Sequence, residues 1–435
     1  SKCNNVLPCD RIPLMQRKNT IKYLLIAVPI LALLGWGLYQ LPPIQQRLRW
    51  RIDIALTYLR GAINPVSSMP TSIVQAEGTL TPTSLPTSTV TPDLTLASPT
   101  PTLLTPSPTP TSSPTPLPGT VALNQPEYEK QGPNNCGPAT LSMYLRYYGW
   151  QGNQKDITNQ IKPFEGDRNV NVEELAYFVN NFAGWLRVQY RVGGDIPTLK
   201  KFIAAGYPVL IEGETDVDQQ YWPSDDLWAG HYLLVTGYDD QTQMMIVMDA
   251  FRDFNKQMSY LDFLADWQSF NYVYIVVYPV DQEATIQALM GEEWSADANR
   301  QHALEKAKAE TSANPNSAFA WFNLGSNQVY FEQFSDAALS YDQARTLELP
   351  QRMLRYQFGP FFAYFHSGRV DDLLALTDYA LKVTPNSEEA MLWKGWGLYR
   401  KGDTPGAIEL FRKSYAANPT SPDAKYALDF VGASP

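Results

Sequence analysis

The chain has 435 residues and a formal net charge of -10, and 34 of its residues are prolines. This length exceeds what a single hydrophobic core usually organises, so we expect two or three folded units, with the prolines concentrated outside them. Residues 1–65 hold nine Lys and Arg against two Asp, so the rest of the chain is strongly acidic. An acidic body lacks the clustered cations that bind phosphates, which argues against nucleic acid as a partner.

An uncharged stretch of 19 residues, 23–41, follows a basic N-terminal tail of residues 1–22. As a helix, this stretch is long enough to cross a hydrocarbon core of ~30 Å, and aromatic residues stand near its ends. No small-residue cleavage signal follows it, so we expect an uncleaved transmembrane signal-anchor helix. Residues 44–65 then combine arginines with regularly spaced Ile and Leu. This pattern fits an amphipathic juxtamembrane helix on the lipid surface, or an ordinary solvated helix.

Residues 66–120 are dominated by Pro, Thr and Ser. Such a segment cannot bury enough apolar surface to offset its chain entropy, so we expect a disordered stalk. Its prolines favour an extended chain of ~3.1 Å per residue, which could reach on the order of 150 Å. Stalks of this composition are commonly exported. We therefore expect a single-pass protein of the cell membrane, with a cytoplasmic N-terminus and extracytoplasmic C-terminal domains.

Residues 121–280 return to the composition of a globular domain. Helices are predicted in its first half and strands in its second half. The expected helices cover residues 137–148, 172–182 and 196–205, and the expected strands cover residues 208–212, 231–238, 244–249 and 272–278. Helices followed by antiparallel strands predict an α+β fold.

The last third of the chain, 281–435, contains a repeat. Prolines recur at Pro315, Pro350, Pro385 and Pro419, which are 35, 35 and 34 residues apart. This is the period of tetratricopeptide repeats, helix pairs that stack into a solenoid. Residues 316–419 resemble three such repeats, of which the middle one is the most divergent. We expect an all-α solenoid with flanking helices over residues 282–313 and 421–431.

Cys136 stands in the run Gln-Gly-Pro-Asn-Asn-Cys-Gly-Pro-Ala. A catalytic thiol must ionise near neutral pH, whereas a free cysteine has a pKa near ~8.5. A helix beginning at this residue would help, because unpaired N–H groups there favour negative charge. We interpret Gly137 as permitting a tight turn into the helix, and Pro138 as fitting its first turn. Gln131, five residues earlier, is close enough in sequence to place an amide beside an oxyanion.

The globular domain contains one histidine, His231, which opens a predicted strand. If this strand pairs with the next one about the loop 239–243, His231 faces residue 251, and Asp249 is its diagonal neighbour on the same face. Diagonal side chains lie ~7–8 Å apart at their roots, within reach of an Asp–His hydrogen bond. Such a carboxylate would orient the ring and stabilise imidazolium. Asp239 and Asp240 remain alternatives for this role.

The acidic stretch 212–226 lacks the glycine and terminal glutamate of a calcium-binding hand, so we expect a solvated lid there. One histidine and one cysteine in the domain are too few for a zinc site. We expect neither a metal nor a cofactor.

Gln131, the Asn-Cys-Gly-Pro-Ala run of 135–139, the Ala-Gly-His-Tyr run of 229–232 and Asp249 together resemble cysteine peptidase family thirty-nine. These are the bacteriocin-processing double-glycine peptidases, and the likeness is greatest to their stand-alone, extracytoplasmic relatives. The resemblance covers residues 121–280 and implies a papain-like fold.

The resemblance also implies roles for four residues: Cys136 as nucleophile, His231 as base, Asp249 as orienting carboxylate and Gln131 as oxyanion residue. We therefore expect a membrane-anchored cysteine peptidase that acts on a peptide or protein substrate. The repeats are expected to bind a peptide or protein partner, because stacked helix pairs form a concave surface. Two alternatives are a membrane-tethered scaffold with a vestigial peptidase domain and a cell-wall amide hydrolase, although the Asp-Cys-Ser start typical of the latter is absent.

Overall fold

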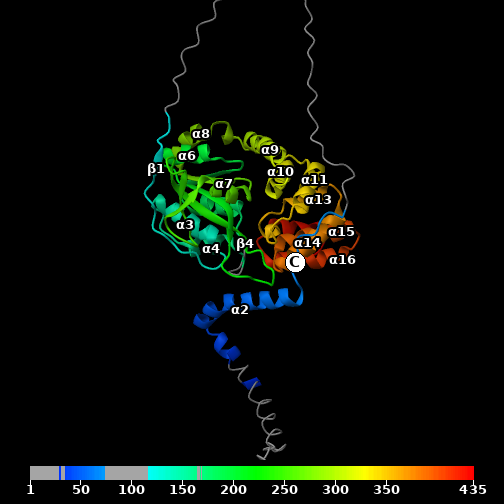
Figure 1. Ribbon diagram of the computed structural model, residues 1–435. Coiled ribbons are helices and arrows are strands. Elements are labelled where there is room, and N and C mark those ends of the chain that lie inside the picture. Colours follow the sequence, from blue (N-terminus) through cyan, green and yellow to red (C-terminus); the bar gives the residue numbers. More distant parts are fainter. Residues whose placement is uncertain (1–28, 31–34, 74–115, 164–166, 168) are drawn as a thin grey trace, which may run out of the picture. The chain divides into compact units, whose positions relative to one another are not determined.

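The computed structural model describes residues 29–30, 35–73, 116–163, 167 and 169–435 (Figure 1). The chain divides into two compact units. The first comprises Ser1–Pro65 with Tyr221–Pro223, and the second comprises Val66–Gln220 with Ser224–Pro435. Residues 23–28 and 31–34 of the predicted transmembrane stretch 23–41 lie outside the described residues, as do 74–115 of the predicted stalk. Among the residues that are described, no helix has both the length and the apolar character to cross a membrane.

The first unit contains helix α2, Pro42–Ile63. Its two leading prolines lie in the first turn, where a missing N–H costs no hydrogen bond. The helix covers the range in which the sequence predicted an amphipathic segment. Several of its apolar side chains are exposed: Leu48, Ile52, Leu56, Leu59 and Ile63. Their spacing of three or four residues places them along one face of the helix.

The second unit is built on a seven-stranded sheet in which all observed pairs are antiparallel. Its strands are β1 (Thr120–Ala122), β2 (Leu186–Arg191), β3 (Val209–Asp216), β4 (Trp228–Asp239), β5 (Met244–Met248), β6 (Lys256–Ser259) and β7 (Tyr274–Pro279). The strand order is β2-β7-β3-β4-β5-β6, and β1 pairs with the far end of β4. This arrangement confirms the α+β class expected from the sequence.

The hairpin of β4 and β5 has the expected register at one end only. Leu234 pairs with Met248 and Val235 with Val247, as predicted for strands folded about the loop 239–243. A bulge between Val235 and Gly237 then shifts the pairing by one residue, so that Asp239 faces Met244. A bulge inserts one unpaired residue into a strand and bends it. The predicted register is therefore correct at the end of the hairpin nearer His231 and wrong by one residue at the loop end.

The sheet is accompanied by the helices α3 (Cys136–Tyr147), α4 (Gln154–Ile161), α5 (Val172–Phe182), α6 (Ile196–Ala204) and α7 (Tyr260–Gln268). Helix α3 packs on β4, α5 on β2, and α6 on β4 and β3. One large core joins α6 and α7 to the strands, with Phe202, Val235 and Trp267 almost completely buried. The sequence missed α4 and α7 and the strands β1, β2 and β6. These elements have at most nine residues each, so any periodicity in them extends over few positions.

The C-terminal region is helical, as expected. After the short helices η1 (Val280–Gln282), α8 (Glu283–Met290) and η2 (Gly291–Trp294), the chain forms α9 (Ala296–Ala313), α10 (Ala318–Tyr330), α11 (Phe334–Thr346), α12 (Met353–Tyr356), α13 (Gly359–His366), α14 (Val370–Val383), α15 (Glu388–Arg400), α16 (Thr404–Ala417) and α17 (Pro422–Phe430). Helices α10 and α11, α13 and α14, and α15 and α16 pack as consecutive pairs. The middle pair, which the sequence marked as divergent, is preceded by the additional one-turn helix α12.

Residues 66–73 begin the segment that we predicted as a stalk, and they make ordered contacts within the second unit. Val66 and Met69 are buried, with 7% and 5% of their surfaces exposed. Arg345 Nε donates a hydrogen bond to the Pro70 carbonyl at 2.7 Å. The predicted stalk therefore includes a part at its N-terminal end that is held against the helical region.

Candidate active site

Cys136 is the first residue of α3 and is partly exposed. The helix begins where the sequence predicted a thiol at a helix N-terminus. Gly137 does not have a positive φ, so our interpretation of a tight glycine turn is wrong. A Cβ atom at Gly137 would instead lie 3.2 Å from the ring of Tyr232. The glycine thus allows α3 to approach β4 closely, which places Cys136 beside the strand that carries His231.

The loop before Cys136 is held by α4, a helix that the sequence analysis missed. Gln154 Oε1 accepts hydrogen bonds from the Gly132 backbone N–H and the Asn135 side chain, both at 2.7 Å. Thr158 also donates to the Asn135 side chain, at 2.9 Å. Asn135 therefore uses its amide to bind α4 instead of capping its own helix. A capping box at Asn153 is the sequence signal that could have identified α4.

His231 and Asp249 are hydrogen bonded, with 2.7 Å between Nε2 and Oδ1. Both side chains are buried, with exposures of 4% and 0%. The same Asp249 oxygen accepts from the backbone N–H groups of Phe251 and Arg252, at 2.9 and 3.1 Å. These bonds fix the carboxylate in the turn after β5. Asp249 binds Nε2, so it leaves the ring Nδ1 of His231 unused, and the same histidine lowers the pKa of the Cys136 thiol.

The three groups influence one another's ionisation. Burial raises the pKa of the Cys136 thiol, but its hydrogen bond and charge interaction with His231 outweigh this effect, so the pKa is lowered overall. Burial lowers the pKa of His231, yet the hydrogen bonds to Asp249 and Cys136 prevail and raise it to about 9. Burial acts to raise the pKa of Asp249, and the hydrogen bond with His231 brings it well below its usual range. The arrangement favours a thiolate–imidazolium pair at neutral pH.

Gln131 is joined to the same turn through its backbone, because its N–H donates to the Ala250 carbonyl at 2.9 Å. Its side-chain Oε1 is buried and has no hydrogen-bond partner among the described residues. This oxygen is a hydrogen-bond acceptor, and it accepts from no other described group. A buried acceptor without a partner is costly unless water or a ligand donates to it.

Asp239 and Asp240, the alternatives to Asp249, lie at the opposite end of β4 from His231. Eight strand residues correspond to about 26 Å, far beyond hydrogen-bonding distance. Asp240 pairs with Lys200, and Asp239 binds loop N–H groups. The structure thus brings Cys136, His231 and Asp249 together and leaves these two carboxylates outside.

The acidic stretch 212–226 is not a uniform solvated lid as we expected. Glu212 lies in β3 and is only 7% exposed, and burial raises its pKa well above the usual value. Its hydrogen bond with Tyr232 partly opposes this shift. Asp225 is also buried and forms an ion pair with Arg352. Within the described ranges, no group of three or more His, Cys, Asp or Glu side chains could hold a metal ion.

The helical region contacts the start of β4 next to His231, which the sequence did not predict. Arg352 Nη1 donates to the Trp228 carbonyl at 2.8 Å. A Cβ atom at Gly230 would lie 2.6 Å from the Phe270 ring and 3.1 Å from the Tyr356 ring. Residue 230 therefore has to be glycine for these rings to close over the strand. The one-turn helix α12 contributes Tyr356 to this contact, which gives a physical reason for the divergent middle repeat.

Comparison with known proteins supports the expected class of domain. Residues 121–275 match the model described as Peptidase_C39 like family. This match agrees with the papain-like α+β domain expected from the sequence and with the coarse function of a cysteine peptidase domain. No curated protein matches the chain significantly.

Several solved structures are similar to parts of the chain. Xylellain, a cysteine protease from Xylella fastidiosa, is 15% identical, with 38% of this chain and 87% of that chain covered and a TM-score of 0.30. The peptidase domain of Streptococcus ComA, a bi-functional ABC transporter of a quorum-sensing pathway, is 16% identical, with 35% and 99% covered and a TM-score of 0.27. YrrB, a TPR protein with an unusual peptide-binding site, is 15% identical, with 34% and 88% covered and a TM-score of 0.18.

Proposed function

We propose that this chain is a cysteine peptidase in which Cys136 is the nucleophile, His231 the general base and Asp249 the orienting carboxylate. The observation that carries the proposal is the buried His231–Asp249 pair, with 2.7 Å between Nε2 and Oδ1, together with a Cys136 thiol whose pKa His231 lowers. The match of residues 121–275 to a peptidase family is independent support. A thiol activated by a base that is itself oriented by a third group is the arrangement that nucleophilic catalysis requires.

In the proposed reaction, His231 holds the proton of Cys136, and the thiolate attacks the carbonyl carbon of a peptide bond. The resulting oxyanion is stabilised by backbone N–H groups at the start of α3 and by the side-chain amide of Gln131. Imidazolium then gives its proton to the leaving amine, and the acyl-enzyme remains. Water attacks the thioester while His231 accepts a proton from it, which releases the carboxylate product and restores the thiol.

The oxyanion role of Gln131 can be separated from the role of Asp249 by experiment. The oxyanion exists only after attack, so Gln131→Ala should lower kcat about 10²–10³-fold and leave Cys136 alkylation unchanged. Asp249→Asn keeps the side-chain volume but removes the charge that stabilises imidazolium, so turnover and thiol reactivity should fall together. Hydrolysis of peptide libraries and iodoacetamide labelling, measured on the same preparations, provide the two readouts.

Gln151→Ala is the matched control for Gln131→Ala, because Gln151 is exposed and bonds only to the nearby Gly149 carbonyl among the described residues. Wild-type turnover by Gln131→Ala would remove that residue from the mechanism. If the wild-type chain cleaves nothing although its thiol is activated, the alternative of a binding or scaffold protein with a vestigial peptidase domain becomes the better account.

We also propose that the chain is anchored in a cell membrane with residues 66–435 outside the cytoplasm, and that the helical region binds a peptide or protein partner. The support for the anchor is the uncharged stretch 23–41, flanked by basic residues. The support for partner binding is the 34–35-residue proline period, which resembles tetratricopeptide repeats, together with the consecutive helix pairs from α10 to α16.

A further inference from the structure

The segment 66–73, which follows α2 in the chain, has neither helix nor strand structure. It belongs to the same compact unit as the helical region. Backbone groups outside regular structure need partners from elsewhere when they are taken out of water. Because Val66 and Met69 are almost fully buried, this segment packs closely and is not simply laid over the surface.

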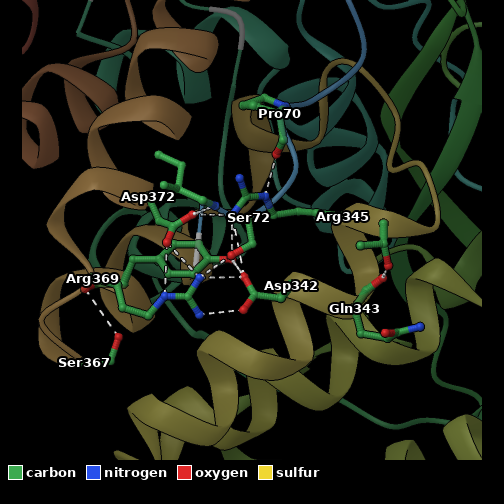
Figure 2. Close-up of polar contacts among 11 residues, drawn as sticks. Pro70, Ser72, Asp342, Gln343, Arg345, Ser367, Arg369 and Asp372 are labelled. Atoms are coloured by element: carbon green, nitrogen blue, oxygen red, sulfur yellow. Dashed lines mark hydrogen bonds and ion pairs between the residues drawn. The ribbon is translucent and has the colours of Figure 1, made fainter. Parts of the chain in front are cut away.

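Two residues of the helical region bind the main chain of this segment (Figure 2). Arg345 on α11 donates from Nε to the Pro70 carbonyl at 2.7 Å, and Asp372 on α14 accepts from the Ile73 N–H at 2.9 Å. Every residue has a carbonyl, and every residue except proline has an N–H. These contacts therefore recognise main-chain groups more than a particular sequence.

A third residue, Arg369, binds the segment through a side chain and is itself firmly held. Its Nη2 donates to Ser72 Oγ at 2.6 Å. The guanidinium also forms ion pairs with Asp342 at 2.5 Å and with Asp372 at 2.8 Å. We call Arg345, Arg369 and Asp372 the backbone clamp.

The backbone clamp is supported from within the helical region. Arg345 Nη1 donates to the Tyr364 hydroxyl at 2.8 Å, and this hydroxyl donates to Asp342 at 2.7 Å. Arg345 also forms an ion pair with Asp372, with 3.4 Å between Nη1 and Oδ1. These contacts do not involve the segment, so they can orient the clamp before a peptide arrives. Pre-orientation of binding groups reduces the entropy lost on binding.

One buried group of the backbone clamp is left without a partner. Arg345 is only 3% exposed, yet its Nη2 makes no hydrogen bond to any other residue that the structure describes. A buried guanidinium donor that lacks an acceptor carries a desolvation cost. The site thus offers one more donor than the segment 66–73 uses, which points to a ligand with an additional carbonyl or carboxylate oxygen.

We propose that the backbone clamp on α11 and α14 is a binding site for an extended peptide, and that the chain's own residues 66–73 occupy it in cis. This proposal deepens the partner binding that we propose for the helical region and does not depend on peptidase activity. A covalently attached segment has an effective concentration of the order of millimolar. Weak contacts can therefore keep the site filled, and a peptide that also satisfies Arg345 Nη2 would displace the segment.

The cis contact is tested in the full chain with two substitutions at one position. Ile73→Pro removes the backbone N–H that donates a hydrogen bond to Asp372. Ile73→Ala keeps this N–H and shortens only the side chain, which is 59% exposed. Hydrogen exchange of the backbone amides of 66–72 should become about tenfold faster in Ile73→Pro, the equivalent of one lost hydrogen bond, and should be little changed in Ile73→Ala. Equal exchange in the two variants would contradict the docked segment.

Binding in trans is tested with a fluorescent peptide that has the sequence of residues 66–73. Met69→Asp places a charge at a buried position of the cis segment and should empty the site. The full-length Met69→Asp chain should then bind the peptide at least about tenfold more tightly than the wild type does, because the competing cis segment is gone. The exposed Lys413→Met substitution, made in the Met69→Asp chain, should leave this binding unchanged.

A second peptide, in which proline replaces Ile73, separates specific docking from general adhesion without altering the protein fold. It should bind the Met69→Asp chain about tenfold more weakly, because it lacks the donor to Asp372. Equal binding of the two peptides, or no binding of either, would overturn the proposal. These experiments measure peptide binding and not peptide hydrolysis. A failure to bind would therefore not contradict the proposed peptidase function, and an inactive peptidase would not contradict the proposed peptide-binding site.

Discussion

At Cys136, two opposing effects determine the charge of the sulfur. Burial favours the neutral thiol, while the hydrogen bond and charge interaction with His231 favour the thiolate. His231 can stay protonated because Asp249 raises its pKa, and Asp249 stays ionised because His231 and the N–H groups of the following turn bind it. Removal of the histidine therefore leaves burial as the main influence on the thiol.

The pH dependence of thiol alkylation tests this account. The pKa of Cys136 is lowered and that of His231 is raised to about 9, so the ion pair should dominate between these two values. Iodoacetamide should therefore label the wild type faster below pH ~8 than it labels an ordinary thiol. In His231→Ala, burial prevails, so labelling should become slow in this range and should rise with pH toward and beyond ~8.5.

His302→Ala is the control for the loss of a histidine, because His302 is exposed and bonds to Glu293 away from the thiol. It should leave the labelling profile unchanged. Equal labelling rates in the wild type and in His231→Ala at pH ~6 would mean that Cys136 is an inert thiol.

The residues of this site differ in how far the sequence could predict their placement. Cys136 and His231 followed from a local motif and from the absence of a second histidine in the domain. The approach of Asp249 followed from strand pairing, because the bulge in β4 lies between Val235 and Gly237 and leaves the register beside His231 unaltered. Gln154 was missed because its effect depends on α4 folding back onto the loop before Cys136.

Among the elements, β4 links the site to the rest of the second unit. One of its ends carries Trp228 and His231, and the helical region packs there through Arg352 and α12. Arg352 is 1% exposed and forms a buried ion pair with Asp225. Breaking one side of such a pair typically costs ~3–5 kcal/mol, because the other charge stays buried. The helical region therefore helps to fix the strand that presents the proposed base.

Arg352→Met combined with Asp225→Asn tests whether this contact positions His231. The double variant removes the ion pair without leaving a buried charge, so it should be more stable than Arg352→Met alone. It should still lose the bond to the Trp228 carbonyl, and we expect several-fold slower alkylation of Cys136 near pH ~6.5. Thermal unfolding and labelling are measured together. If the folded double variant is labelled like the wild type, β4 is positioned without help from Arg352. Arg412→Met, a substitution at an exposed site, is the control.

Prediction of whole elements succeeded where a hydrophobic period was long and failed where tertiary contact determined the structure. The helix α5 has the predicted bounds, 172–182, because its apolar residues recur at helical spacing between an asparagine cap and a glycine. Strand β2 alternates apolar Leu, Val and Tyr with polar Arg, Gln and Arg, but over only six positions, and the sequence analysis did not predict it. It is a strand because β7 pairs along its whole length. Helix α12 has four residues, too few for any periodic signal.

At the scale of the whole molecule, the chain joins an N-terminal unit to a peptidase-like sheet domain and a helical region. Helix α2 of the first unit has a row of exposed apolar residues, from Leu48 to Ile63. Such a row is typical of a helix that lies at a lipid surface, although an ordinary partner surface would look similar. Only residues 42–65 separate the proposed anchor from the docked segment 66–73, so the two proposals together predict where the chain can be cut.

The topology of the proposed anchor is tested by proteolysis of intact cells. Protease added from outside should cleave within residues 74–115, whose Pro, Thr and Ser content does not favour a folded core, and should spare residues 66–73 because the helical region covers them. The membrane-bound fragment should therefore end after residue 73, and Ile73→Pro should allow additional cleavage closer to α2. A chain that lacks residues 1–65 should no longer sediment with membranes. If the protease cleaves the chain only after the cells are opened, the proposed orientation is reversed. If the chain that lacks residues 1–65 still sediments with membranes, the membrane contact lies elsewhere in the chain.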